Sequence, residues 1–134
     1  MGKLEYWTED DLLYAFDNPF NAFCKFVHNE SRRAGWYTNI DTGEELNRNI
    51  PEMLCLIHSE ISEAMEGYRK GLQDDKLPQR KMIEVELADA IIRIGDLAEH
   101  LSLDVGGAIL EKIQYNRSRE DHKIENRKKG GKAF

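Results

Sequence analysis

Cysteine and long apolar runs are both scarce in this sequence. Its 134 residues include only Cys24 and Cys55, with no Cys-x-x-Cys pair. This excludes a disulfide framework and a zinc ribbon and predicts two reduced thiols. No stretch approaches the roughly 20 apolar residues of a membrane span, and the N-terminus lacks the apolar core of a signal peptide. We therefore expect a soluble, cytoplasmic protein with no membrane partner.

The charge of the chain is unevenly distributed. The net charge is −6, yet residues 112–134 carry eight Lys and Arg against three acidic residues, which makes this segment +5 and residues 1–111 −11. An acidic body suits a metal site, and a basic segment beside it suits anion binding. The basic segment lacks interleaved aromatic residues, so we expect no nucleic-acid partner. A solvated C-terminus is the simpler interpretation of the same charges.

Alternating runs of β-branched residues and hairpin turn signals are also missing, which predicts an all-α protein. Apolar spacing and capping residues predict helices over about 9–16, 19–32, 51–71, 78–102 and from Asp104 to about 118. The middle of 78–102 is apolar nearly all round, so we expect this helix to be the most buried, and we expect Ile109 and Ile113 to face the interior. Residues 1–134 are predicted to form one domain, a four-to-five-helix bundle with a basic, flexible tail from about residue 120.

Two acidic couplets are the most informative feature. Glu60 and Glu63 lie three residues apart on one predicted helix, and Glu86 and Asp89 lie three apart on the next. Each couplet shares a helix face and borders an apolar stripe. Burying ionised carboxylates is costly unless a partner compensates, and four of them converging from two helices would repel one another.

A hard divalent cation resolves both problems, because Mg²⁺ prefers oxygen ligands. A di-iron carboxylate bundle is the main competing interpretation, and it requires a histidine three residues after a glutamate on two helices. Neither His58 nor His100 has that spacing. The pattern therefore favours Mg²⁺, with Mn²⁺ as a substitute, over iron. A pair of ordinary surface couplets is the alternative.

The couplets also resemble a known family. Glu60-Ile-Ser-Glu63, then 22 residues, then Glu86-Leu-Ala-Asp89 is similar to the signature of the MazG-type all-α nucleoside triphosphate pyrophosphohydrolases. The segment 59–71 resembles that family's first metal helix, and the segment 112–119 resembles its Lys-x-x-x-Asn-x-x-Arg phosphate-side segment. The closing Gly-Gly-Lys-Ala-Phe resembles the tail of small, phage-type members. The resemblance covers roughly residues 20–134.

The resemblance implies an activity and an assembly. Members of this family hydrolyse a nucleoside triphosphate between the α and β phosphates, which yields the monophosphate and pyrophosphate. They use Mg²⁺ and act in nucleotide-pool control as homodimers or as tetramers built from two dimers. A phage-encoded member works in the host cytoplasm. The lack of a Gly-x-x-x-x-Gly-Lys-Ser/Thr loop agrees with α–β rather than β–γ cleavage. The expected preferred substrate is a purine deoxynucleotide, dGTP first.

The resemblance also assigns roles to particular residues. Glu60, Glu63, Glu86 and Asp89 become the metal ligands and catalytic carboxylates. The residues assigned to the nucleotide or its phosphates are Lys112, Asn116, Arg119, His28 and Trp36. Lys132 joins them because the flexible glycines before it let it fold over the phosphates. Some relatives have a tyrosine near the base at the position of Arg93, so this chain departs from their pattern there, and Arg93 could supply a phosphate contact instead.

Several alternatives stay open at this point. Trp36 can serve as a loop anchor, His28 as a surface histidine, and Arg93 as an ion-pair partner of Asp89 at i, i+4. Related dUTP-directed or phosphoribosyl-nucleotide pyrophosphatases fit the same bundle, and a non-enzymatic helical interaction protein is the remaining class.

Overall fold

The computed structural model describes residues 18–119, 121 and 123–130. The predicted helix at 9–16, Lys132 and the last residues of the tail lie outside this range. The described residues form five helices, namely α2 (Pro19–Arg33), α3 (Ile50–Lys70), α4 (Met82–His100), α5 (Val105–Ser118) and α6 (Ile124–Lys128). Two isolated β-bridges are the only extended pairing among the described residues. The prediction of an all-α protein is confirmed.

The chain divides into two compact units. One holds residues 21–103, and the other holds residues 1–20 and 104–134. None of the described helices combines the length and the apolar character that crossing a bilayer requires.

Helix α3 begins and ends as the sequence predicts. The Asn49 side chain accepts a hydrogen bond from the backbone N–H of Glu52 (3.0 Å) at its start, where Pro51 occupies the first turn. Gly71 ends it with φ +63°, a left-handed conformation that glycine adopts without a steric penalty. Capping residues therefore define both ends of the helix that carries the first acidic couplet.

The prediction that Pro78 begins the next helix is wrong, since α4 begins at Met82. The buried Asp74 carboxylate accepts hydrogen bonds from the backbone N–H groups of Lys76 (3.0 Å) and Leu77 (2.7 Å). This turn lets Gln73 pair with Lys81 in a β-bridge, so the chain stays non-helical until Met82. Pro78 predicts that the first turn of the helix begins at this residue, but hydrogen bonds within the loop hold this stretch in a non-helical conformation instead.

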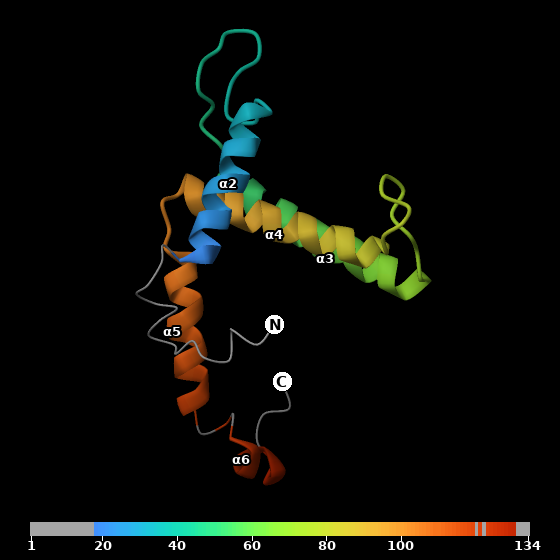
Figure 1. The fold of residues 1–134 in the computed structure, drawn as a ribbon, viewed down its shortest axis with the longest axis vertical. Helices are drawn as coiled ribbons and strands as arrows, with labels where there is room; N and C mark the ends of the chain where they lie inside the picture. Colours follow the sequence, from blue (N-terminus) through green and yellow to red (C-terminus); the bar gives the residue numbers. More distant parts are fainter. Residues whose placement is uncertain (1–17, 120, 122, 131–134) are drawn as a thin grey trace, which may run out of the picture. The chain divides into compact units, whose positions relative to one another are not determined.

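Helices α3 and α4 pack against each other as an antiparallel hairpin (Figure 1). Gly67 permits close approach near the loop, because an added Cβ would lie 2.8 Å from Cγ of Met82. Helix α2 packs on the other half of α4, where a Cβ at Gly95 would lie 2.9 Å from Cγ2 of Val27. A core cluster of Tyr37, Met53 and Leu97 holds the same end of the hairpin to the loop that follows α2.

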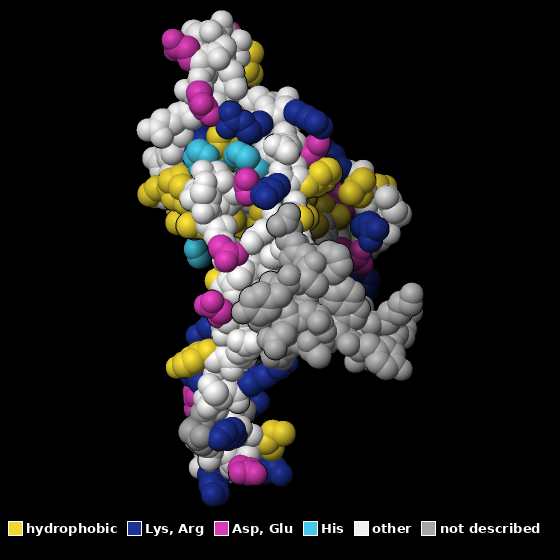
Figure 2. Space-filling model, turned by 60° about the vertical axis from the view of Figure 1, so that its left-hand side comes forward, with side chains coloured by type: hydrophobic (Ala, Val, Ile, Leu, Met, Phe, Trp, Pro, Cys, Tyr) yellow, Lys and Arg dark blue, Asp and Glu magenta, His cyan; other side chains and the backbone are white. Residues whose placement is uncertain are grey.

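Helix α4 has more buried residues than any other described helix, as the sequence predicts, but the middle of its apolar run is partly exposed in the single chain. Leu87, Ile91 and Ile94 are exposed, and apolar side chains remain visible at the surface in Figure 2. The helix has only α3 and part of α2 to pack against, so one side of its apolar run has no cover within this unit.

In the second unit, Asp104 caps α5 by accepting a hydrogen bond from the backbone N–H of Gly107 (2.9 Å), as predicted. Ile109 and Ile113 are exposed, which corrects the expectation that they face an interior. Their side chains lie on a short helix with one buried residue, Gly106, so α5 has little interior to face. Helix α6 lies within the stretch that the sequence assigns to the basic tail.

Candidate active site

Three of the four predicted carboxylates meet between α3 and α4. Glu60 and Glu63 project from α3 and Glu86 from α4, and one oxygen of each lies within 4.8 Å of the others. Glu60 is buried, whereas Glu63 is exposed. The i, i+3 spacing on α3 and the packing of the hairpin bring these groups together, as the sequence predicts. We call these three residues the acidic cluster.

The acidic cluster perturbs its own ionisation. Burial raises the pKa of Glu86 to about 7, and the hydrogen bond and charge of Glu60, with the charges of Glu63 and Asp89, act in the same direction. Burial is the largest influence on Glu60 and opposes its ionisation, but the hydrogen bonds with Arg93, Glu86 and Glu63 and the charge of Arg93 together outweigh burial and lower the pKa of Glu60 below its usual value. Near neutral pH, a proton in this pair therefore resides more on Glu86 than on Glu60.

Arg93 bonds to Glu60 across the hairpin. Its Nε donates to Oε1 of Glu60 at 2.6 Å, whereas the sequence offered Asp89 as the partner one turn back on the same helix. The Glu60 side chain is 9% exposed and the Arg93 side chain is 41% exposed. The guanidinium therefore reaches both the buried carboxylate and solvent.

Asp89 lies on α4 outside the acidic cluster. Burial and then the charge of Glu60 raise its pKa, while the charge of Arg93 opposes the shift. The structure thus places Asp89 within electrostatic range of the acidic cluster, and Asp89 lines the same cavity as Glu60.

The donor set of the acidic cluster fits a hard divalent cation. All of its atoms are carboxylate oxygens, which Mg²⁺ and Mn²⁺ prefer. Burial first, and then the neighbouring carboxylates, raise the pKa of Glu86 and disfavour its charged form, which a bound cation would favour. The residues present therefore fit the metal that the sequence predicts.

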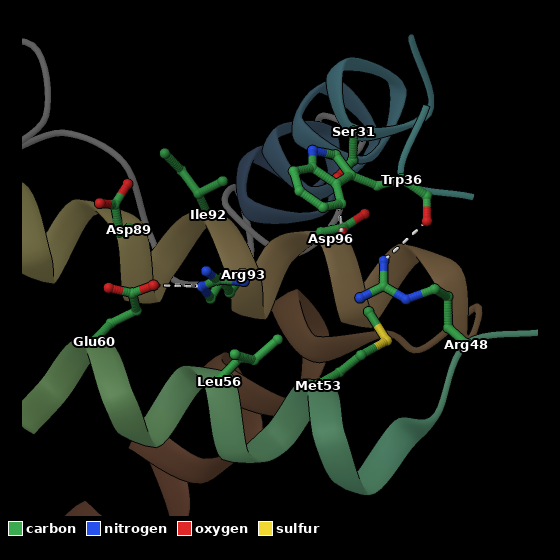
Figure 3. A pocket seen from close by; sticks show the side chains of 10 residues that line it. All are labelled: Ser31, Trp36, Arg48, Met53, Leu56, Glu60, Asp89, Ile92, Arg93 and Asp96. Atoms are coloured by element: carbon green, nitrogen blue, oxygen red, sulfur yellow. Dashed lines mark hydrogen bonds and ion pairs between the residues drawn. The ribbon is translucent and has the colours of Figure 1, made fainter. Parts of the chain in front are cut away.

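A cavity of about 470 Å³ opens beside the acidic cluster (Figure 3). Its size is within the range of small-molecule sites. Helix α2, its following loop, α3 and α4 all contribute side chains. The lining residues are Ser31, Trp36, Arg48, Met53, Leu56, Glu60, Asp89, Ile92, Arg93 and Asp96.

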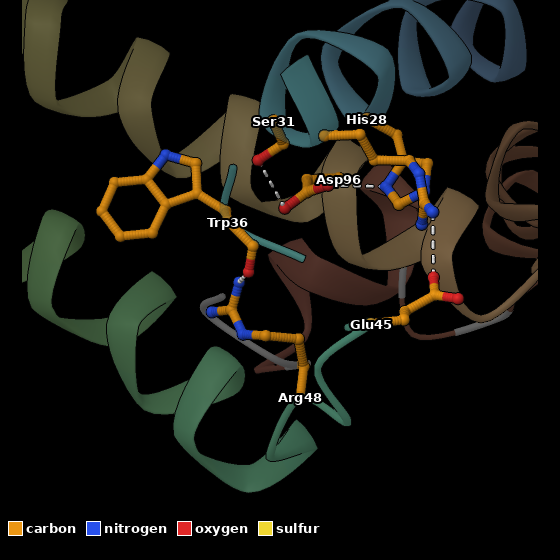
Figure 4. Close-up of polar contacts among 7 residues, drawn as sticks. His28, Ser31, Trp36, Glu45, Arg48 and Asp96 are labelled. Carbon is orange, nitrogen blue, oxygen red and sulfur yellow. Dashed lines mark hydrogen bonds and ion pairs between the residues drawn. The ribbon is translucent and has the colours of Figure 1, made fainter. Parts of the chain in front are cut away.

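The indole of Trp36 lines this cavity with 64% of the residue exposed. The backbone carbonyl of Trp36 accepts a hydrogen bond from Nη1 of Arg48 at 3.1 Å, which fixes the loop at this point (Figure 4). Trp36 is therefore anchored through its backbone, and its side chain lines the cavity.

A buried network behind Trp36 centres on Asp96. Oδ1 of Asp96 accepts from Nδ1 of His28 (2.8 Å), and Oδ2 accepts from the hydroxyl of Ser31 (3.2 Å), as Figure 4 shows. The His28 side chain is 12% exposed, so it is not a surface histidine. His28 does not line the cavity in this arrangement and acts on it through Asp96.

Tyr37 completes the network on its buried side. Its ring centroid lies 4.8 Å from that of His28, and burial first and then the proximity of Asp96 raise the pKa of its hydroxyl. Among the residues that the structure describes, this hydroxyl has no hydrogen-bond partner.

The sequence analysis missed Asp96. Asp89, Arg93 and Asp96 follow one another at spacings of four and three, which places them on one face of α4. This spacing is a signal of a shared face that the sequence carries, although Asp96 belongs to neither acidic couplet.

Lys112, Asn116 and Arg119 belong to the second unit. Lys112 and Asn116 lie on α5, which ends at Ser118 near the predicted end, and Arg119 follows it with extended backbone. Nζ of Lys112 lies 4.7 Å from the Tyr115 ring centroid, and Nε of Arg119 donates to Asp121 at 3.0 Å. Arg119 is ion-paired with Asp121 in this structure, and its predicted phosphate contact stays a prediction.

Comparison with known proteins adds no family assignment. The chain matches no protein-family model, no curated protein and no solved structure. The family resemblance of its motifs therefore stays a prediction.

Proposed function

We propose that this protein is a Mg²⁺-dependent hydrolase of nucleoside triphosphates that releases the monophosphate and pyrophosphate. The observation that carries the proposal is the double role of Glu60. This side chain belongs to the acidic cluster and also lines the adjoining cavity. A ligand in the cavity would therefore lie directly beside a metal held by the acidic cluster.

The chemistry of the cavity suits a nucleotide. Its aromatic wall, Trp36, offers a flat surface for a base, and its cations, Arg93 and Arg48, offer donors for anionic oxygens. Nucleoside triphosphates combine a planar base with a chain of such oxygens, and the volume of the cavity suits a molecule of this class.

Each part of the proposed reaction has a candidate residue. Glu60, Glu63 and Glu86 would hold the metal, with Asp89 beside them. When bound, the cation would lower the pKa of water and stabilise charge on phosphoryl oxygens. Arg93 can exchange Glu60 for a phosphate oxygen, because more than a third of its side chain is exposed. A carboxylate that keeps its negative charge near neutral pH, as Glu60 does, can orient the attacking water.

A substrate panel tests this proposal. The eight common ribo- and deoxyribonucleoside triphosphates are incubated with Mg²⁺, and release of pyrophosphate is measured through an added inorganic pyrophosphatase. We expect hydrolysis of at least one nucleotide and its loss in the Glu60→Gln variant. The exposed Asp41, which lies outside the cavity, supplies the control Asp41→Asn, whose rate should equal that of the wild type. Equal rates for Glu60→Gln and the wild type would contradict the assignment.

A further inference from the structure

Asp96 offers a buried carboxylate to the cavity at a distance from the acidic cluster. It lies two helical turns beyond Asp89 on α4, which corresponds to about 10 Å along the helix axis. Figure 3 shows the two side chains well separated along α4, with Arg93 between them. A ligand whose phosphates lie near Glu60 would thus extend its other end toward Asp96.

The Asp96 carboxylate is held in a fixed orientation. His28 donates to one oxygen and Ser31 to the other, and the residue is 7% exposed. An ionised carboxylate has about four acceptor positions, so these two hydrogen bonds leave capacity for a ligand. A ligand that lacks a matching donor would leave this buried acceptor without a hydrogen bond, which costs binding free energy. Such a group therefore selects ligands that carry the donor.

The surroundings of Asp96 suit a planar heterocycle. The indole of Trp36 lies on the loop side of the cavity, and Leu56 and Met53 project toward it from α3 (Figure 3). The guanidinium of Arg48 adds a donor at the same end. A ring between these apolar surfaces would meet an acceptor from α4 and a donor from the loop.

The five common bases differ in what they offer a carboxylate. Guanine alone presents two adjacent donors, N1–H and the N2 amino group, which match the two oxygens of a carboxylate. Adenine and cytosine place an acceptor nitrogen beside their single amino group, and the imide N–H of thymine and uracil is flanked by two carbonyls. Guanine also carries the acceptors O6 and N7, which an arginine binds well.

We propose that Asp96 is a specificity-determining residue that selects guanine nucleotides by accepting hydrogen bonds from N1–H and the N2 amino group. This inference rests on the proposed function and names the substrate class of the same cavity. It depends on the Asp96 network and not on the acidic cluster, so the two can fail separately.

Comparison of dGTP with dITP tests the inference, because hypoxanthine lacks only the N2 amino group. A hydrogen bond to a charged acceptor predicts that the wild type prefers dGTP in kcat/KM by about tenfold to a hundredfold. Asp96→Asn replaces one acceptor oxygen with a donor, so the ratio should fall to about one or invert. The control Asp41→Asn should keep the wild-type ratio.

Binding gives the same ratio without turnover. Calorimetry with analogues of dGTP and dITP that carry a non-hydrolysable α–β bridge, in Mg²⁺, measures base selection alone. Preferential binding of the dGTP analogue with no hydrolysis of dGTP would contradict the proposed function and keep the role of Asp96. Hydrolysis with equal preference for dGTP and dITP would overturn the role of Asp96 alone.

Circular dichroism would show whether Asp96→Asn folds. If it does not, a second variant still tests the inference. Ser31→Ala removes the donor to Oδ2 of Asp96 and leaves the carboxylate in place. Loss of this restraint should reduce the dGTP-to-dITP ratio several-fold. An unchanged ratio in a folded Ser31→Ala or Asp96→Asn protein would overturn the inference.

Discussion

The carboxylates of the acidic cluster repel one another, and single substitutions can measure how much each one contributes to metal-dependent turnover and to stability. Changing Glu63 or Glu86 to Gln removes a charge from the cluster and a ligand from the proposed metal site. We expect turnover to fall roughly 100-fold or more, since even residues that only support metal ligands contribute 10–100-fold. Without metal, the melting temperature should stay the same or rise, because repulsion is relieved.

Glu84→Gln is the matched control for Glu86→Gln. Glu84 lies two residues earlier on α4, is exposed, and pairs with Arg80 at 3.1 Å outside the acidic cluster. Its replacement should leave turnover unchanged within about a factor of two, because surface pairs of this kind contribute little. Retention of wild-type rates by both Glu63→Gln and Glu86→Gln would show that the metal site is misassigned.

The protonation of Glu86 gives a pH-dependent prediction. Its pKa is about 7 in the folded protein and is raised from an ordinary value of 4.5, so between these two pH values the folded state binds more protons than the unfolded state. The free energy of unfolding of the metal-free protein should therefore fall as the pH rises through this interval. Asp89, whose pKa is also raised, contributes in the same direction.

Chemical denaturation at a series of pH values, with a chelator present, measures this dependence. Glu86→Gln should flatten the profile between about pH 5 and 7, and Glu84→Gln should not. Mg²⁺ affinity should increase over the same interval, because the metal competes with the proton on Glu86. A wild-type profile that rises with pH in this interval would refute the assigned shift.

At the scale of the helices, the contact between α2 and α4 depends on Gly95. A Cβ at this position would lie 2.9 Å from Cγ2 of Val27 and 3.1 Å from Cε1 of Phe23. Overpacking of this kind costs about 1–3 kcal/mol, which the better helix propensity of alanine offsets by up to about 1 kcal/mol. Gly95→Ala should therefore lower the melting temperature in thermal denaturation.

Ala88→Ser, at an exposed position of the same helix, is the control and should change the melting temperature little. The contact also places Asp96, the residue after Gly95, against His28 and Ser31 of α2. A Gly95→Ala protein as stable as the wild type would show that α2 and α4 are not in this close contact.

Local signals explain which helix boundaries the sequence predicts. Asn49, Gly71 and Asp104 act on neighbouring backbone groups, so their capping roles can be read from the sequence alone. The start of α4 could not be predicted in this way. It depends on Asp74 and on the pairing of Gln73 with Lys81, which form only when the loop closes.

The same distinction applies to the candidate site. Helical spacing predicts that Glu60 and Glu63 share a face, and the packing of α3 on α4 adds Glu86. The role of Asp96 depends on His28 and Ser31, which are more than 60 residues away in the chain. Local spacing along the sequence does not reveal contacts between residues so far apart in the chain. The hydrogen bonds of Asp96 could therefore be found only from the structure.

At the scale of the whole molecule, exposed apolar side chains predict self-association. Ile61 and Met65 on α3 and Leu87 and Ile91 on α4 are all at least 43% exposed, and they recur at helical spacing. Surfaces of this kind in a soluble protein usually mark an interface. Light scattering at micromolar concentration should therefore report a dimer or a tetramer rather than a 15.5 kDa monomer.

Ile91→Lys should shift this equilibrium toward the monomer, because burying its charge in an apolar interface is costly. Ile40→Lys is the matched control, since Ile40 is 89% exposed in the loop after α2 and has no place in the helical face. A monomeric wild type would refute the prediction, as would an equal effect of the two variants.

The central claim is that the acidic cluster and its adjoining cavity together cleave a nucleoside triphosphate between the α and β phosphates. Phosphorus NMR of a nucleotide incubated with the protein and Mg²⁺ tests this directly, because it identifies both products. We predict the signals of a nucleoside monophosphate and pyrophosphate, and their absence with Glu60→Gln. Signals of a nucleoside diphosphate and orthophosphate, or no reaction with any of the eight nucleotides, would contradict the account.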